Sequence, residues 1–194
     1  MSKLFSWGRG WNLASRTLGG LMLGAALMMA SPGGAVAAEP AQFSKSGIDV
    51  GMVCKDVAKS VAFYKNAIGL TERKGFEANG EFTKSIGLTE GYGIKVSVLS
   101  AGDDPKGAIL KLMQIPEGKP ADGKNEFLHS QLGFRYLTLG VPDITAAAER
   151  IKAAGVTTVA NTPKQIPGDL GSGVYIIVVR DPDGNFVELV GPKK

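Results

Sequence analysis

The chain has almost none of the residue types that build small disulfide-linked or metal-stabilised domains. Its 194 residues include one cysteine, Cys54, and one histidine, His129. One cysteine excludes an internal disulfide framework and a cysteine-rich zinc module. One histidine excludes a histidine-rich catalytic metal site within a single chain. The chain is 44% hydrophobic and 21% charged, so its composition predicts a folded domain and not a disordered one.

Acidic residues are missing from the first 37 positions, which carry three basic residues. An uncharged apolar stretch over 18–30 follows these basic residues, and small side chains at Ala35 and Ala37 come after a Pro-Gly-Gly break. Basic start, apolar centre and small-residue end are the three parts of a secretory signal peptide. We therefore expect residues 1–37 to be a signal peptide cleaved after Ala37, with cleavage after Ala38 as the alternative.

An uncleaved membrane anchor is the other interpretation of this segment, but the apolar stretch is shorter than the ~20 residues of a spanning helix. Cleavage predicts an exported protein, periplasmic or secreted, with no membrane association afterwards. It would also lower the formal net charge from +4 to +1, because three basic and no acidic residues leave with the signal. The remaining lysines form no basic stripe, so we expect no nucleic-acid partner.

The rest of the chain contains an internal repeat. Residues 50–57 align with 137–144, and each stretch is an alternating strand followed by an aspartate, Asp56 or Asp143. A carboxylate at this position can cap the helix that the following apolar spacing predicts. Similar glycine-rich and Asp-Pro-x-Gly turn sequences recur later in both halves, so each half is predicted to run strand, helix, strand, long loop, strand, turn, strand.

The predicted organisation has five parts. They are the signal peptide (1–37), an N-terminal tail (38–45), a first module (46–115), a linker (116–133) and a second module (134–194). Neither module is long enough to bury a core comfortably alone, so we expect the two to share one.

Two sequence stretches carry a resemblance to a known family. One is Asp-Val-Ala-Lys-Ser-Val-Ala-Phe-Tyr at 56–64, continuing to Ile68-Gly69-Leu70, and the other is Arg-Asp-Pro-Asp-Gly-Asn-Phe-Val-Glu-Leu at 180–189. The chain resembles the vicinal oxygen chelate superfamily, which includes glyoxalase I, bleomycin-resistance proteins and extradiol dioxygenases. The resemblance implies an α+β fold, in which two βαβββ modules form one cupped mixed β-sheet with helices on the outside. It also implies a small-molecule ligand and the ability to form a homodimer.

In this family the first and last strands of each module supply His or Glu ligands to one divalent metal. Carried over by motif and repeat offset, the four positions are Asp49, Lys111, Tyr136 and Glu188. An ammonium has no lone pair to offer a metal, so the family's usual ligand set is not present. We therefore predict no metal cofactor, with a divalent ion held by Asp49 and Glu188 as the alternative.

The same four residues suggest a metal-free centre. Lys111 would lie roughly where the metal would be, neutralised by Asp49 and Glu188, and would bind an anionic or enolate-like ligand. Tyr136 could donate a hydrogen bond or a proton. In a catalytic version Tyr136, Glu188 and Lys111 carry the reaction, which is of the lyase, isomerase or dioxygenase type. In one alternative the ion pairs only fill the cavity and carry no chemistry. In another the chain is a non-catalytic protein of the bleomycin-resistance type, which binds and sequesters a small molecule.

Strand alternation predicts what else lines the cavity. Phe186 is predicted to face the same side as Glu188, Met113 the same side as Lys111, and Phe134 the same side as Tyr136. In the third strand of each module we expect the most apolar set to face the helix, which leaves Lys95 and Tyr175 toward the cavity. The predicted binding residues are therefore Asp49, Lys111, Tyr136, Glu188, Phe134, Phe186, Met113, Lys95 and Tyr175.

Overall fold

The computed structural model describes residues 42–194, so the predicted signal peptide and the first part of the N-terminal tail lie outside the described residues. In residues 42–194 no helix is long and apolar enough to span a bilayer. These residues form one compact unit.

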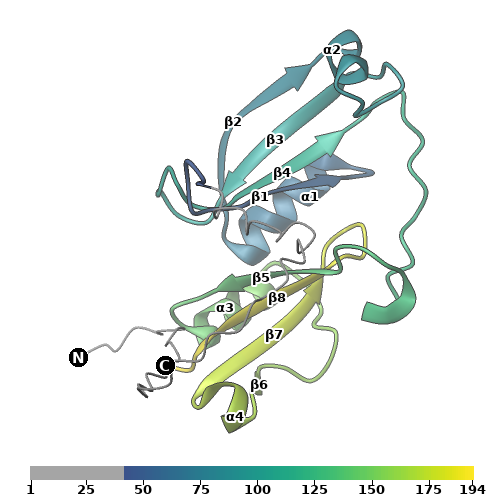
Figure 1. The fold of residues 1–194 in the computed structure, drawn as a ribbon. Coiled ribbons are helices and arrows are strands. Elements are labelled where there is room, and N and C mark those ends of the chain that lie inside the picture. Colours follow the sequence, from purple (N-terminus) through teal and green to yellow (C-terminus); the bar gives the residue numbers. More distant parts are fainter. Residues whose placement is uncertain (1–41) are drawn as a thin grey trace, which may run out of the picture. The chain divides into compact units, whose positions relative to one another are not determined.

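The first half of this unit is a four-stranded sheet with one main helix (Figure 1). Its elements are β1 (Asp49–Val53), α1 (Val57–Phe63), a π-helical turn η1 (Tyr64–Ile68), β2 (Thr71–Ala78), α2 (Gly80–Ser85), β3 (Ile94–Ser100) and β4 (Ile109–Gln114). The strand order is β1-β4-β3-β2, with β1 and β4 parallel and the other neighbours antiparallel.

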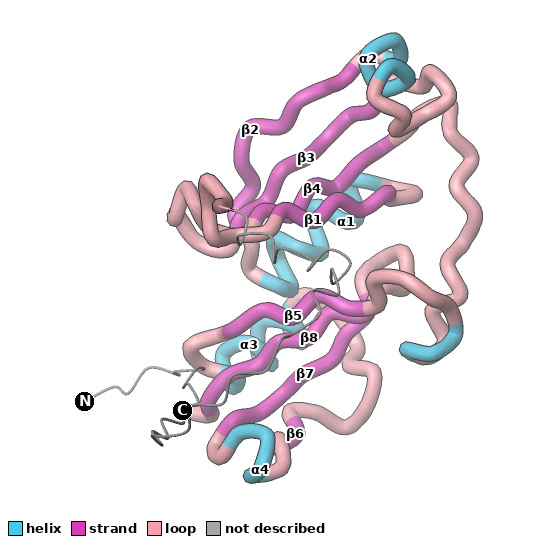
Figure 2. The backbone as a smooth tube through the Cα atoms, in the orientation of Figure 1, coloured by secondary structure: helices cyan, strands magenta, loops and turns pink. Residues whose placement is uncertain are grey.

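The second half repeats this arrangement. Its elements are β5 (Tyr136–Gly140), α3 (Ile144–Ala153), β6 (Lys164–Gln165), α4 (Gly168–Gly171), β7 (Val174–Arg180) and β8 (Phe186–Pro192). The order is β5-β8-β7-β6, again with the first and last strands parallel. A long loop that carries the short 3₁₀-helix η2 (Leu128–Ser130) joins the halves (Figure 2).

The predicted α+β fold of two βαβββ modules is confirmed. Backbone hydrogen bonds divide the strands into two sheets of four, since β1 and β5 are edge strands that do not pair with each other. The sequence analysis did not predict three short helices: α2, η2 and α4. Of these, α2 lies in the loop between β2 and β3, where Asn79 caps it through a bond from the Phe82 amide (2.8 Å).

Local sequence signals set the ends of both main helices. Asp56 accepts the Lys59 amide (3.1 Å) at the start of α1, and Asp143 accepts the Thr145 amide (2.9 Å) at the start of α3. After η1 the chain turns at Gly69, whose φ of 90° lies in the left-handed region that favours glycine. The predicted caps are therefore present in the structure.

The two modules share one hydrophobic core. It contains Leu110 and Leu112 from β4, Val187 and Leu189 from β8, and Ile151 from α3, together with residues of α1 and η1. The helices lie side by side, because α3 contacts η1 and the Arg150 guanidinium of α3 donates to the carbonyls at the end of η1, those of Ala67 (3.1 Å) and Ile68 (2.9 Å). One core made by both halves agrees with the shortness of each half.

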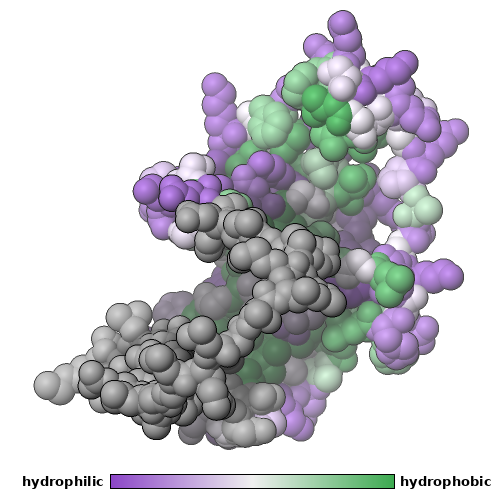
Figure 3. All heavy atoms as spheres, viewed as in Figure 1, coloured by the Kyte–Doolittle hydropathy of each residue, from purple (hydrophilic) through white to green (hydrophobic). Residues whose placement is uncertain are grey.

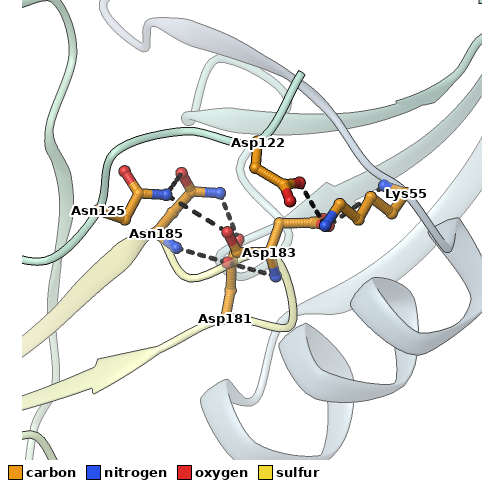
Figure 4. Close-up of polar contacts among 6 residues, drawn as sticks. All are labelled: Lys55, Asp122, Asn125, Asp181, Asp183 and Asn185. Carbon is orange, nitrogen blue, oxygen red and sulfur yellow. Dashed lines mark hydrogen bonds and ion pairs between the residues drawn. The ribbon is translucent and has the colours of Figure 1, made fainter. Parts of the chain in front are cut away.

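A buried carboxylate, Asp181, connects the second module's last turn to the first module's helix. Its side chain accepts the Asp183 and Asn185 amides (3.0 and 2.8 Å) and the Asn185 side-chain amide (3.0 Å), as Figure 4 shows. The Tyr64 hydroxyl of η1 donates to the same carboxylate at 3.0 Å. Burial, followed by the Asp181 charge, raises the pKa of the Tyr64 phenol above its usual value, so the hydroxyl remains a donor.

Neighbouring groups extend this connection to the linker. The Asp183 carboxylate accepts the Lys55 amide (3.2 Å) just before α1, and Lys55 forms an ion pair with Asp122 of the linker. Asn125, also of the linker, donates to the Asp183 carbonyl (3.3 Å). Figure 4 shows these groups in one cluster. The turn at 181–185 therefore touches both the first module and the linker.

Removing the Tyr64 hydroxyl should destabilise the protein. Tyr64→Phe takes one donor from a buried carboxylate, which costs about 1–3 kcal/mol of unfolding free energy. Urea unfolding followed by circular dichroism measures the change. The matched control is Tyr92→Phe at an exposed tyrosine, for which we expect a change within about 0.5 kcal/mol. Equal stabilities of the two variants would contradict the role of the buried bond.

Candidate functional site

Each sheet has one face packed on the shared core and one face that points away from α1 and α3, which we call the open face. Leu110, Leu112, Val187 and Leu189 are buried in the core. Side chains alternate along a strand, so the residues between them lie on the open face. Strand register places Gly51 beside Lys111 and Thr138 beside Glu188 on this face.

An ion pair occupies the open face of the first sheet. The Lys111 Nζ lies 2.9 Å from Asp49 Oδ2, and Lys45 of the preceding segment pairs with the other carboxylate oxygen. Hydrogen bonds from Lys45, and then from Lys111, lower the pKa of the Asp49 carboxyl below its ordinary value. The site therefore holds one ionised carboxylate between two ammonium groups.

The second sheet carries a different polar pair on its open face. The Thr138 hydroxyl donates to Glu188 Oε2 at 2.7 Å. Within residues 42–194 no lysine, arginine or histidine nitrogen pairs with the Glu188 carboxylate, so the predicted Lys111–Glu188 ion pair is not formed there. Alternation along β5 puts Thr138 on the same face as Tyr136, and the parallel register of β5 and β8 sets it beside Glu188.

A cavity of about 250 Å³ lies where β1 and β5 approach each other. Three predicted aromatic residues line it: Phe186, which is buried, and Phe134 and Tyr136, whose side chains are exposed. The opposite wall is the end of β1, including Gly51 and Val53. A cavity with aromatic walls suits a flat organic molecule.

Gly51 connects the cavity with the ion pair. It lines the cavity and is also the strand partner of Lys111, one strand spacing away. A Cβ at position 51 would lie 3.1 Å from the Met113 methyl group, so the Met113 side chain lies over Gly51 and takes the space that a larger residue would need. Met113 pairs with Val53 and shares this face with Lys111, as alternation along β4 requires.

Two predicted cavity residues face the other way. In β3, Val98 pairs with Lys111 and Val96 with Met113, so these two valines lie on the open face. Lys95 alternates with them and therefore lies on the helix side of the sheet. In β7, Val178 pairs with Glu188, and Tyr175 packs against the core. The predicted orientation of Lys95 and Tyr175 was wrong because it assumed that the most apolar set must face the helix.

The open face is itself apolar in the third strands, with Val96 and Val98 in β3 and Ile176 and Val178 in β7. Figure 3 shows apolar side chains over the strands of the first sheet and hydrophilic ones at its rim. An apolar face with a few charges provides both burial and orientation for a small ligand.

The linker is more ordered than a simple connector, because two arginines bind its backbone. Arg135 donates to the carbonyls of Leu128 (3.0 Å), Lys124 (3.1 Å) and Phe127 (3.2 Å), and Arg180 donates to that of Glu126 (2.7 Å). The Arg180 guanidinium also lies 4.0 Å from the centre of the Phe186 ring. These contacts hold the linker beside the aromatic cavity, and the sequence analysis did not predict them.

The lone histidine and the lone cysteine lie outside the site. His129 is exposed on the linker and stacks on Phe127, with ring centres 5.7 Å apart. Cys54 is buried, which raises its thiol pKa to about 11. A protonated, buried thiol is a poor nucleophile.

Comparison with known proteins identifies the family. A family model described as the Glyoxalase/Bleomycin resistance protein/Dioxygenase superfamily matches residues 48–189. The chain belongs to this superfamily. A probable lactoylglutathione lyase of Vibrio parahaemolyticus is 30% identical over 141 residues, which cover 72% of this chain and 85% of the relative. A probable lactoylglutathione lyase of Vibrio cholerae is 29% identical over 140 residues, with the same coverage of both chains.

Solved structures of superfamily members share the fold. A glyoxalase family protein of Bacillus cereus matches with a TM-score of 0.64 and 16% identity, covering 81% of this chain and all of that one. Glyoxalase I of Zea mays matches with a TM-score of 0.55 and 19% identity, covering 76% of this chain and 45% of that one. An antibiotic binding protein of Streptomyces matches with a TM-score of 0.50 and 19% identity, covering 78% of this chain and all of that one. At these identities the likeness shows the fold alone.

The residues at the four positions that the family resemblance predicts as ligands do not fit a divalent metal. The Lys111 ammonium has no lone pair, and the Asp49 carboxylate is already bonded to two ammonium groups. Between residues 42 and 194 no three His, Cys, Asp or Glu side chains are grouped as a metal site requires. We therefore derive no chemistry through a metal at this centre.

Added zinc or nickel should leave the melting temperature of the purified protein unchanged. A metal that binds only the folded state would raise it in proportion to its occupancy, and the donor set offers no such site. Differential scanning fluorimetry with and without metal or chelator measures this. A rise of several degrees with zinc that Glu188→Gln abolishes would contradict the interpretation.

Proposed function

We propose that the protein binds a small organic anion with a flat apolar body on its open face, without a metal. The observation that carries the proposal is the Lys111 ammonium, which pairs with Asp49 at 2.9 Å where the superfamily positions a metal ligand. Gly51 separates this cation from the aromatic cavity by one strand spacing. A cation beside an aromatic pocket favours a ligand with an anionic group at one end.

The charges on the open face support this assignment. On the first sheet, Lys45 and Lys111 carry two positive charges against the single negative charge of Asp49, which leaves that group with one net positive charge. The Glu188 carboxylate belongs to the second sheet, where it accepts from Thr138. The partial exposure of the Lys45, Asp49 and Lys111 side chains keeps the electrostatic contribution modest. The aromatic walls would then supply most of the affinity, and Lys111 would supply orientation and selectivity.

Catalysis is the second candidate, because relatives at about 30% identity are probable lactoylglutathione lyases and because Glu188 is kept on the open face. In that case Lys111 would stabilise a developing oxyanion, Tyr136 would donate a proton and Glu188 would accept one. Turnover of lactoylglutathione that Glu188→Gln and Tyr136→Phe each abolish would favour this candidate over a binding protein.

The proposal also includes export of the protein from the cytoplasm. The charge and apolar pattern of residues 1–37 supports a location outside the cytoplasm, where a binding protein would meet ligands from the environment.

Lys111→Met should remove the preference for an anionic ligand. Two fluorescent probes with the same ring system test this: anilinonaphthalene sulfonate, which is anionic, and N-phenylnaphthylamine, which is neutral. We expect the variant to bind the sulfonate about three- to tenfold more weakly, or about 0.7–1.4 kcal/mol, and to bind the neutral probe unchanged. Fluorescence titration measures both constants.

Lys152→Met is the matched control, because it removes an exposed lysine on α3. The open face points away from this helix. It should leave both affinities unchanged. If the wild type does not prefer the sulfonate, or if Lys111→Met and Lys152→Met behave alike, the proposed anion site is wrong.

Signal cleavage can be tested directly on the exported protein. Expressed from its full sequence in a Gram-negative host, the chain should be recovered from the periplasm with Ala38 as its first residue. Intact-mass spectrometry and N-terminal sequencing measure this. Ala35→Leu with Ala37→Leu should block cleavage, because the peptidase requires small side chains there. Recovery of the uncut chain from the cytoplasm would contradict export.

A further inference from the structure

The segment before β1 is fixed to the turn between β3 and β4. The Gly47 amide donates to the Lys106 carbonyl at 2.9 Å. A Cβ at position 47 would lie 2.3 Å from the Gly107 carbonyl carbon, so a larger residue would not fit. This close approach determines where the segment enters β1, and it brings Lys45 beside Asp49, four residues later.

Lys45 changes the charge of the site on the open face. It and Lys111 bind the two oxygens of one carboxylate. Without Lys45, Asp49 and Lys111 would form a neutral pair. With it, the group carries one unit of positive charge, and each ammonium has three donors, of which Asp49 uses one. The three side chains are 29–34% exposed, so a ligand can reach the remaining donors.

We propose that Lys45 is a specificity-determining residue, which holds Asp49 so that Lys111 can bind the ligand's anionic group. The ligand class is a small organic oxyanion, such as a carboxylate or sulfonate. The inference rests on the proposed function, since it concerns the same open-face site. It adds that selectivity depends on a residue of the N-terminal segment, which lies outside the two βαβββ modules.

The test compares Lys45→Gln, Lys45→Arg and the wild type with the two naphthalene probes at low and at physiological ionic strength. Lys45→Gln should weaken binding of anilinonaphthalene sulfonate about three- to tenfold and flatten its salt dependence, because a screened charge has been lost. Binding of N-phenylnaphthylamine should stay unchanged. Lys45→Arg keeps the charge and should bind the sulfonate like the wild type.

Lys59→Gln is the matched control, because Lys59 also pairs with a nearby aspartate, Asp56, at 3.4 Å on α1. It should change neither affinity. If Lys45→Gln binds the sulfonate like the wild type while Lys111→Met does not, this inference fails and the proposed function stands. If Lys45→Gln weakens both probes equally, Lys45 is only structural and the inference also fails. If the wild type shows no preference for the sulfonate, the proposed function and the inference fail together.

Discussion

The bond from Tyr64 to the buried carboxylate of Asp181 joins the two modules at the centre of the protein. Its donor comes from the helix of the first module and its acceptor from the last turn of the second. Both groups are buried, so separating them would leave a buried donor and acceptor without partners and would lower the unfolding free energy of the protein. The same turn binds the linker through Asn125 and the start of α1 through Lys55. This turn therefore contacts the first module, the second module and the linker at one place.

Holding β1 beside β5 creates the cavity, because each strand supplies one wall. The helices occupy one face of both sheets, which leaves the open face for chemistry. The polar groups on this face differ between the two sheets. The first sheet has two ammonium groups around one carboxylate, and the second has a carboxylate that accepts from a threonine hydroxyl. Aromatic side chains line the cavity between β1 and β5. The fold thus brings residues from strands far apart in sequence to one surface.

The chain has the superfamily's architecture, but most residues at its predicted ligand positions differ from the superfamily's usual His or Glu. Helix caps, the Asp-Pro-Asp-Gly turn and the core positions serve folding. Of the four residues that the family resemblance predicts at the ligand positions, only Glu188 is of the superfamily's usual type. A lysine at such a position cannot coordinate a metal, because its ammonium has no lone pair, and it places a positive charge there instead. Members of one fold can differ in this way, because function depends on a few side chains placed on a common scaffold.

The amino-acid sequence by itself determined the two modules, their helix caps and the strand alternation that directs Lys111, Met113 and Glu188 to one face. These are local properties: hydrophobic period, turn residues and side-chain capping act within a few positions along the chain. The tertiary structure decided the orientation of Lys95 and Tyr175, the partners Lys45 and Thr138, and the linker's binding by Arg135 and Arg180. Apolarity could not predict the orientation of the third strands. Both faces of β7 are apolar, and in β3 the open face with Val96 and Val98 is more apolar than the helix side with Lys95 and Ser97. The partners depend on strand register and on the close approach at Gly47, which arise only when distant segments pack together.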